Sequence, residues 1–333
     1  MATSQNDTTI NEEEGIKPVS ANMDFSEAQQ VICSVIPPLN PTFHKGQAGR
    51  VAIIGGSTEF TGATYFAAMT SLRTGCDLSY VICSSDSAPI IKSYSPELIV
   101  FPILDQTNAL DEIVKSHLPK FHSIVIGPGL GRNERTFSTV GSLISTLKDR
   151  ETPVVLDADI LFFISKCPEI VRGYTKAILT PNVVEFDRLY SSVFRTESQP
   201  IGDDPKTAVE ELARTLGHIT ILRKGSQDII SNGHHTFVGD EIGSPRRCGG
   251  QGDILAGSIG TFSHWSHNAF RDHSTISSPI YQRYSPTIIA ALAGSMLTKR
   301  CARLAFTKFG RSTLTTDLIG EIKHSFESLF PID

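Results

Sequence analysis

The amino-acid sequence contains no apolar run that approaches the roughly 20 residues of a membrane-spanning helix. It also lacks any block of basic residues, and its formal net charge of −5 disfavours nucleic-acid binding. Its six cysteines form no CxxC pair, so neither a disulfide framework nor a zinc site is indicated. Residues 1–15 are polar, with neither the apolar core of a signal peptide nor the arginines of a mitochondrial presequence. The sequence therefore predicts a cytoplasmic protein without a membrane or nucleic-acid partner.

The two most common nucleotide-binding motifs are also absent. The glycine-rich stretch at residues 55–62 follows an apolar strand, but it has neither the GxGxxG spacing nor the lysine of a Walker loop. An NAD-dependent dehydrogenase is disfavoured, because it needs that early GxGxxG and an acidic residue about 20 positions later. The stretch either contacts a ligand directly or only joins a strand to a helix.

What the sequence does contain is an alternation of short apolar strands with helix-forming segments. A strand, a glycine-rich turn, a helix and a second strand follow one another over residues 51–83, which is the order of a parallel βαβ unit. We expect a disordered tail at residues 1–22 and one α/β domain at residues 23–333, with three layers: a mostly parallel central sheet and helices on both faces.

The remaining elements follow from apolar periodicity and turn residues. A hairpin is expected at 228–238 around Asn232–Gly233, and the polar stretch 266–278 is expected to be a variable surface loop. Further strands are predicted at 98–101, 123–126, 153–156, 177–180 and 219–222, and helices at 24–36, 63–74, 136–148, 183–190, 206–216, 285–308 and 315–326, with one more starting near 252.

Polar or glycine-rich residues follow five of the predicted strands, after Ile54, Ile126, Leu156, Thr180 and Leu222. In open parallel sheets, ligands bind beyond the carboxyl ends of the strands. We therefore expect these five segments to meet at one cleft.

Several of these segments have both a ligand-binding and a purely structural interpretation. Three glycines at 127–132 favour a close backbone approach to a ligand, although the segment would also serve as a turn beneath a helix. Asp157 and Asp159 could hold a hydrated Mg²⁺ or cap the next helix. Asn182 and Glu185 could contact a ligand, form a capping box, or do both. Lys224 could meet a nucleotide phosphate.

The most informative segment is Gly-Gly-Gln-Gly-Asp at 249–253, which opens an apolar, helix-forming run. Its glycines allow several backbone N–H groups to point at one spot, and a helix N-terminus adds partial positive charge there. Such a cradle suits a phosphate. Asp253 would then remove a proton from a hydroxyl that is being phosphorylated, hold a metal, or simply complement the helix dipole.

Seven motifs in one order carry a more specific resemblance. They are His-Lys-Gly-Gln-Ala-Gly-Arg at 44–50, Gly-Gly at 55–56 with Tyr-Phe-Ala-Ala at 65–68, Tyr-Ser-Pro-Glu at 94–97, Gly-Pro-Gly-Leu-Gly-Arg at 127–132, Asn-Val-Val-Glu-Phe at 182–186, Lys-Gly at 224–225 and Cys-Gly-Gly-Gln-Gly-Asp at 248–253. Together they resemble the eukaryotic ATP-dependent (S)-NAD(P)H-hydrate dehydratases, which have the ribokinase-like fold. The resemblance spans about residues 40–330.

The resemblance implies a substrate, a cosubstrate and a set of site residues. The family uses ATP and Mg²⁺ to convert the S epimer of hydrated NADH or NADPH back to NADH or NADPH, and Asp253 would be the catalytic base facing the substrate hydroxyl. The implied substrate-binding residues are Gly129, Asn182, Val183, Val184, Glu185, Phe186, Asp187, Arg188 and Asp253. The implied ATP-binding residues are Lys224, Gly225, Ser226, Gln227, Asp228, Gly243, Ser244, Pro245, Arg246, Arg247, Cys248, Gly249, Gly250, Gln251 and Gly252. The ligands of Mg²⁺ are not identified.

The residues preceding the match are too few for the epimerase domain that bacterial relatives often carry, so the resemblance implies a separate NAD(P)H-hydrate epimerase as functional partner. The sequence is compatible with a homo-oligomer. Two alternatives remain: a ribokinase-like kinase of a vitamin precursor or sugar that releases a stable phosphoester, and a nucleotide-binding module without catalysis.

Overall fold

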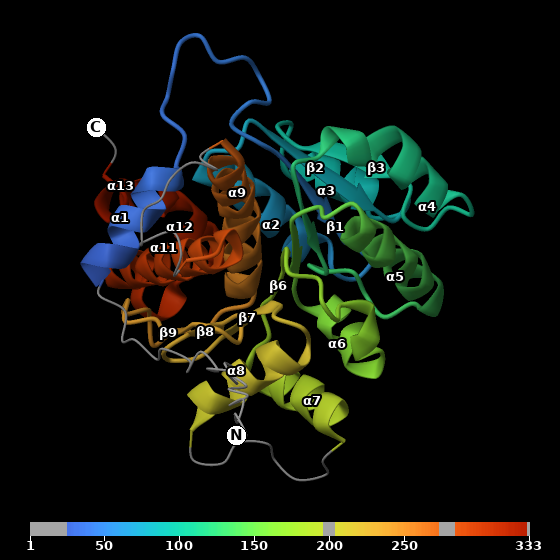
Figure 1. Cartoon of the computed structure of the whole chain (residues 1–333). Coiled ribbons are helices and arrows are strands. Elements are labelled where there is room, and N and C mark those ends of the chain that lie inside the picture. Colours follow the sequence, from blue (N-terminus) through green and yellow to red (C-terminus); the bar gives the residue numbers. More distant parts are fainter. Residues whose placement is uncertain (1–24, 196–203, 273–283, 332–333) are drawn as a thin grey trace, which may run out of the picture.

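The computed structural model describes residues 25–195, 204–272 and 284–331. The predicted tail at residues 1–22 lies outside these ranges. Within them, nine strands form one sheet in the order β3-β2-β1-β4-β5-β6-β7-β8-β9 (Figure 1). The strands are β1 (Arg50–Ile54), β2 (Leu78–Cys83), β3 (Ile99–Pro102), β4 (Ser123–Ile126), β5 (Val154–Leu156), β6 (Ala177–Leu179), β7 (Thr220–Arg223), β8 (Ile229–Ser231) and β9 (Thr236–Val238).

The pairings confirm a mostly parallel sheet with an antiparallel hairpin at one edge. Strands β1 to β7 pair in parallel, with Val51 opposite both Ser79 and Ser123 at the centre. Strands β8 and β9 pair antiparallel, as the Asn232–Gly233 turn predicted. Four consecutive residues of β1 and all four of β4 are fully buried, as expected for strands covered on both faces.

Helices cover both faces of the sheet (Figure 1). Alternate side chains of β1 enter the two cores: Val51 and Ile53 face one, and Ala52 and Ile54 face the other. The first core packs against α1 (Phe25–Val35), α2 (Thr61–Thr74), α3 (Ala88–Tyr94), α9 (Gln251–Asp272), α11 (Pro286–Phe309), α12 (Thr315–Gly320) and α13 (Ile322–Leu329). The second packs against α4 (Ala109–Glu112), α5 (Glu134–Asp149), α6 (Asp159–Lys166), α7 (Val183–Phe194) and α8 (Pro205–Thr215).

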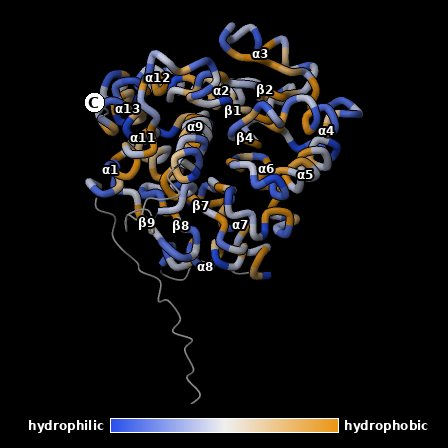
Figure 2. Tube along the Cα trace, turned by 45° about the horizontal axis from the view of Figure 1, so that its top comes forward, coloured by the Kyte–Doolittle hydropathy of each residue, from blue (hydrophilic) through white to orange (hydrophobic). Residues whose placement is uncertain are grey.

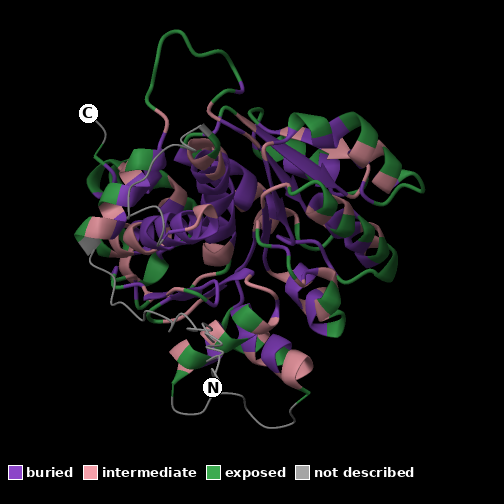
Figure 3. Cartoon of the chain, in the orientation of Figure 1, coloured by how far each residue is buried: buried purple, intermediate pink, exposed green. Residues whose placement is uncertain are grey.

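Burial follows this layering. The strands and the inner helix faces are buried, whereas the exposed residues lie on the outer helix faces and the loops (Figure 3). Helix α5 shows the pattern in its sequence, because hydrophobic and hydrophilic residues alternate along it (Figure 2) and its buried positions include Phe137, Val140 and Leu147. In the described part of the chain, no helix is long and apolar enough to cross a membrane.

Three sequence-based expectations need correction. The predicted surface loop at 266–278 is wrong for residues 266–272, which continue helix α9; residues 273–278 lie outside the described ranges. Ser263 and Ser266 are fully buried there, because serine is small enough to pack on the core face of a helix despite its hydroxyl. The predicted helix 315–326 is two helices, α12 and α13, that meet at Glu321. Helices α3 and α4 were not predicted, since seven and four residues are too short to show a period.

Candidate active site

The carboxyl ends of five neighbouring strands form the candidate active site. Strands β1, β4, β5, β6 and β7 are consecutive in the sheet, so the five segments that follow them lie along one edge. Backbone hydrogen bonds join these segments: Ser57 N donates to Gly129 O at 2.7 Å, and Lys224 N donates to Pro181 O at 2.8 Å. These contacts fix the rim of the site before any ligand binds.

At the centre of this edge lies an ion pair between Lys224 and Asp157. Lys224 Nζ is 2.7 Å from Asp157 Oδ1 and 3.9 Å from Glu185 Oε2. Thr180 Oγ1 donates to the same Asp157 oxygen at 2.8 Å. Burial would lower the pKa of Lys224, but the charges of Asp157, Glu185 and Asp253 outweigh it and raise that pKa, so the ammonium stays charged. Burial raises the pKa of Glu185 despite the opposing charge of Lys224.

Asp253 lies in the first turn of α9, next to this pair. A Cβ built on the preceding Gly252 would lie 3.5 Å from Lys224 Nζ and 3.7 Å from Asp157 Oδ2, so the start of the helix abuts both side chains. Burial and the negative charge of Asp157 raise the pKa of Asp253 well above its usual value, against the opposing effect of Lys224. A carboxylate of raised pKa is a stronger base than a solvated aspartate, which is the property that proton removal from a hydroxyl requires.

The glycine loop before α9 is tight on one side and open on the other. Gly250 has a φ of +97°, and a Cβ there would lie 2.7 Å from Thr315 Oγ1. A Cβ on Gly249 would meet no atom within 4 Å. The loop is therefore held against α12 on its inner side, while its other side leaves room for a phosphate beside the N-terminus of a 22-residue helix.

The predicted substrate segment forms the start of α7. Asn182 Oδ1 accepts from Glu185 N at 3.0 Å and Glu185 Oε2 accepts from Asn182 N at 2.8 Å, which confirms the capping box. Glu185 thus caps the helix and faces Lys224 at once. Val183 and Val184 are exposed, whereas Phe186 is fully buried in the core, so its side chain points away from any ligand. The Arg188 guanidinium lies 5.4 Å from the centre of the Phe162 ring, above its face.

Asp157 and Asp159 do not cap α6. The residue before that helix is Ala158, which has a φ of +55° and makes no side-chain cap. Asp159 Oδ2 instead accepts from Gly131 N at 3.0 Å, while Asp157 pairs with Lys224. The capping interpretation is therefore wrong for both aspartates, because their carboxylates are used to connect neighbouring strand ends.

A family model described as NAD(P)H-hydrate dehydratase matches residues 51–324. The chain belongs to the NAD(P)H-hydrate dehydratase family. It is 51% identical over 309 residues to the ATP-dependent (S)-NAD(P)H-hydrate dehydratase of Ixodes scapularis, covering 92% of this chain and 97% of that one. It is 46% identical over 307 residues to the protein of the same name in Homo sapiens, covering 92% and 86%.

Two solved structures show the same fold at low identity. One is the ADP/ATP-dependent NAD(P)H-hydrate dehydratase of Bacillus subtilis, co-crystallised with ATP and Mg²⁺: the TM-score is 0.64 at 20% identity, covering 90% of this chain and 97% of that one. The other is a ribokinase-like superfamily protein from Enterococcus faecalis, with a TM-score of 0.70 at 19% identity, covering 94% and 100%. This dehydratase-family chain therefore has the ribokinase-like fold.

In this family member, the loop 224–228 is held by residues that the sequence did not single out. Gly225 N donates to Asp228 Oδ1 at 2.9 Å, and Ser295 Oγ donates to Asp228 Oδ2 at 2.7 Å. Lys299 Nζ donates to Gly225 O at 3.0 Å and to Ser226 O at 2.9 Å. Ser295 and Lys299 are polar residues four positions apart in an Ala-rich helix, a pattern that could have indicated a shared polar contact.

The predicted segment 243–252 is held mostly by hydrogen bonds between its own side chains and its own backbone atoms. Ser244 Oγ accepts from Arg246 N at 2.9 Å, and Arg247 Nη1 donates to Ser244 O at 2.6 Å. Thr315 Oγ1 donates to Gly249 O and lies 3.7 Å from Cys248 Sγ. Thr315 was also missed, because a threonine far along the chain has no local signal. The segment is thus preformed as a loop that presents its glycines beside Asp253.

Proposed function

We propose that this chain catalyses the ATP-dependent dehydration of the S epimer of hydrated NADH or NADPH. The observation that carries the proposal is the buried Asp253 between a preformed glycine loop and the Lys224–Asp157 pair. The names of the relatives at 43–52% identity support the choice of substrate. The structure by itself supports phosphoryl transfer to a hydroxyl.

In the first step, Asp253 takes the proton from the hydroxyl on C6 of the hydrated nicotinamide ring. The hydroxyl oxygen forms a bond to the γ-phosphorus of ATP, and the bond from that phosphorus to ADP breaks. The N–H groups of residues 249–252 would stabilise the charge on the transferred phosphoryl oxygens, and the Lys224 ammonium would neutralise part of it. Hydroxide, a poor leaving group, is converted to phosphate by this step.

In the second step, the lone pair of the ring nitrogen expels phosphate from C6. Loss of a proton from C5 then restores the ring double bond. One of the two protons released, from the hydroxyl and from C5, leaves with the phosphate as HPO₄²⁻, and the products are NADH or NADPH, ADP, phosphate and one proton, so atoms and charges balance. A phosphoryl-transfer scaffold thus acts as a dehydratase because the phosphoester it makes is unstable.

The carboxylates around Lys224 also fit a magnesium ion held together with ATP. Asp157 and Glu185 both face the Lys224 ammonium, so a positive charge already lies between them. Mg²⁺ usually takes one or two carboxylates, several waters and substrate phosphates, rather than a cage of protein ligands. In keeping with this, no group of three or more potential metal ligands occurs among the described residues. We propose that Asp157 and Glu185 would hold Mg²⁺ through water, and the ion would supply positive charge to the ATP phosphates.

The deciding experiment mixes purified protein, ATP and hydrated NADH and follows the absorbance of reduced nicotinamide. We expect the absorbance to recover, with one ADP formed per NADH. If ADP forms and a phosphorylated hydrate accumulates without recovery, the protein is a kinase with a stable product. If neither ADP nor NADH forms, the chain is a binding module.

Two further expectations belong to the same proposal. Because the S epimer alone is the substrate, an epimerase would have to supply it from the R epimer, and we propose this enzyme as the functional partner. An epimer mixture should then be repaired completely only when an epimerase is added. We also propose that the protein acts in the cytoplasm, which cell fractionation would test.

A further inference from the structure

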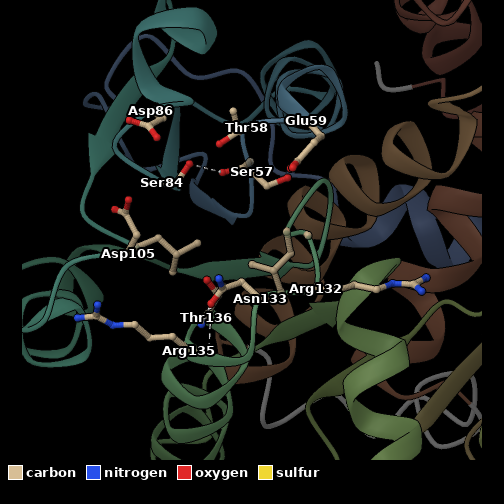
Figure 4. Close-up of a pocket in the computed structure, with 14 residues that line it drawn as sticks. Ser57, Thr58, Glu59, Ser84, Asp86, Asp105, Arg132, Asn133, Arg135 and Thr136 are labelled. Carbon is tan, nitrogen blue, oxygen red and sulfur yellow. Dashed lines mark hydrogen bonds between the residues drawn. The ribbon is translucent and has the colours of Figure 1, made fainter.

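A cleft lies at the β1 and β4 end of the candidate active site, on the side of the sheet edge away from Lys224. It has a volume of about 650 Å³ and is lined by the segments that follow β1, β2, β3 and β4 (Figure 4). The first six strands are arranged in the order 3-2-1-4-5-6, so β2 and β3 are added on one side of β1 and β4 to β6 on the other, while all six strands remain parallel. In open α/β sheets this switch point is where the loops diverge and where nucleotides bind. Of the site segments described above, only those that follow β1 and β4 border this cleft, through residues 56–59 and 130–132.

The cleft is preformed. Ser84 N donates to Gly56 O at 3.2 Å, and the Ser87 hydroxyl donates to the same oxygen at 2.9 Å, so the segments after β1 and β2 are joined. The bond from Ser57 N to Gly129 O joins β1 to β4, and the bond from Gly131 N to Asp159 joins β4 to β5. The last two bonds also connect the cleft to the end of β5, where Asp157 lies. Asp253, in the first turn of α9, is next to Asp157.

The cleft wall carries three carboxylates, from Glu59, Asp86 and Asp105, and two guanidinium groups, from Arg132 and Arg135, so acidic groups outnumber basic ones and favour a ligand that donates hydrogen bonds. The Arg135 guanidinium already donates to Thr107 Oγ1 at 3.1 Å. Asp86 and Asp105 lie at one side of the cleft, and Arg132 extends away from it (Figure 4), toward Asp159 at 3.5 Å and the Phe162 ring. Asp105 already accepts from Ser85 N and Ser85 Oγ. Asp86 is exposed and has no hydrogen bond or ion pair with any described residue. Its carboxylate is available to a ligand.

Two other groups point to the same kind of ligand. The first N–H groups of α5, at Arg135 and Thr136, are occupied by Asn133 Oδ1, so this helix start is not free to bind a phosphate. The buried Ser57 Oγ, on the cleft wall, has no partner among the described residues. Because this oxygen is covered, it would bond a hydroxyl-bearing ligand only after the Ser57 side chain turned toward the cleft.

We propose that this cleft binds the adenosine half of the dinucleotide substrate, with Asp86 accepting hydrogen bonds from the ribose hydroxyls. The inference rests on the proposed function. The reacting nicotinamide ring must reach Asp253. ATP would lie on the other side of Asp253 from the cleft, at residues 224–228 and 243–252. The remainder of the dinucleotide therefore leaves across β5 and β4, past Gly129, toward the cleft. The acidic group after β2 corresponds in position to the one that holds a ribose diol in dinucleotide-binding sheets.

This placement determines a preference between the two substrates. A 2′-phosphate on the adenosine ribose would face Asp86 and Asp105 and be repelled by them, whereas a free diol would be bound. Wild-type protein should therefore have a higher kcat/KM for hydrated NADH than for hydrated NADPH. Asp86 and Asp105 would thus determine which dinucleotide is preferred, although neither residue contacts the ring that reacts at Asp253.

The test compares Asp86→Asn with Asp149→Asn, which changes another exposed acid at the end of α5 that does not line the cleft. Three substrates are used: hydrated NADH, hydrated NADPH and the hydrate of reduced nicotinamide mononucleotide, which lacks the adenosine half. We expect Asp86→Asn to raise KM for hydrated NADH by about fivefold or more and to narrow the preference over hydrated NADPH. KM for the mononucleotide hydrate and for ATP should be unchanged, and Asp149→Asn should match the wild type throughout.

Equal effects on dinucleotide and mononucleotide hydrates, or no effect on either, would overturn the cleft assignment. Failure of the wild type to restore any NADH would instead overturn the proposed function. In that event, titration of NADH with each protein, followed by NADH fluorescence, still tests whether the cleft binds the adenosine half. Weaker NADH binding by Asp86→Asn than by Asp149→Asn supports it, and equal binding refutes it.

Discussion

Lys224 Nζ lies 2.7 Å from Asp157 Oδ1, and the two residues are 67 positions apart in the chain. The Asp157 side chain is 2% exposed and that of Lys224 is 21% exposed. The pair joins the ends of β5 and β7, and it stands beside Asp253 in the first turn of α9. The pair therefore holds two strand ends together and also places a positive and a negative charge next to Asp253.

Removing the positive charge of Lys224 while Asp157 remains should destabilise the folded protein. In Lys224→Met, the buried Asp157 carboxylate loses its counterion, so we expect the free energy of unfolding to fall by about 3 kcal/mol. Urea denaturation measures this change. The double variant Lys224→Met/Asp157→Asn should recover part of the loss because no unpaired charge remains. Equal stability of the single variant and the wild type would show that the pair contributes nothing.

Asp253→Asn separates binding from chemistry. The amide keeps the shape of the side chain but cannot accept the hydroxyl proton, so kcat should fall by about 10²-fold or more. ATP binding, measured by calorimetry, should persist. The variant should also be at least as resistant to heat as the wild type at neutral pH, because it removes a buried charge that Asp157 repels. Retained turnover would remove Asp253 from the mechanism.

The pH dependence of the reaction follows from the raised pKa of Asp253. The base must be ionised to act, so kcat/KM for the hydrate should decline as pH falls through that raised pKa. The acid limb should therefore lie at higher pH than the ordinary range of an aspartate. The same shift means that the folded state gains stability as pH falls and Asp253 is protonated, and loses it as pH rises through the raised pKa. A pH–rate profile that stays flat down to the ordinary aspartate range would contradict this.

Two neighbouring glycines provide a matched pair. Gly250→Ala places a Cβ 2.7 Å from Thr315 Oγ1 in a backbone with φ +97°, so it should cost about 1–2 kcal/mol of stability. The Cβ of Gly249→Ala would have open space around it. The free energy of unfolding of this variant should therefore lie within about 0.5 kcal/mol of the wild-type value. Chemical denaturation of both variants tests the difference. Equal losses would mean that the loop is not held against α12.

Lys299 should support ATP binding indirectly, by holding the loop 224–228 in place. Lys299→Met removes the donor to Gly225 O and Ser226 O, so we expect KM for ATP to rise by about tenfold while KM for the hydrate stays constant. Lys323→Met is the control, since the Lys323 side chain is 76% exposed and lies far along the chain on α13. A rise in both KM values would show a general loss of structure.

The sequence determined the elements whose signals are local. The strand at 123–126 was predicted at its observed bounds, and the βαβ unit and the hairpin were predicted to end at residues 83 and 238, where β2 and β9 end. Short apolar runs between turn residues are sufficient to identify such strands. The capping box of Asn182 and Glu185 was also predicted, since its two partners are three residues apart. The order of the strand ends led to the expectation of a single site, and the linked motifs indicated the family.

The tertiary structure decided what depends on residues far apart in the chain. Lys224 had no predicted partner until folding placed β5 and β7 on either side of β6. Ser295, Lys299 and Thr315 have ordinary local sequences, and only the packing of α11 and α12 brings them to the loops 224–228 and 243–252. The cleft beside Asp86 likewise depends on four strand ends meeting at the switch point. Local periodicity encodes helices and strands, whereas the pairing of charges and the shape of a cleft exist only once the chain is folded.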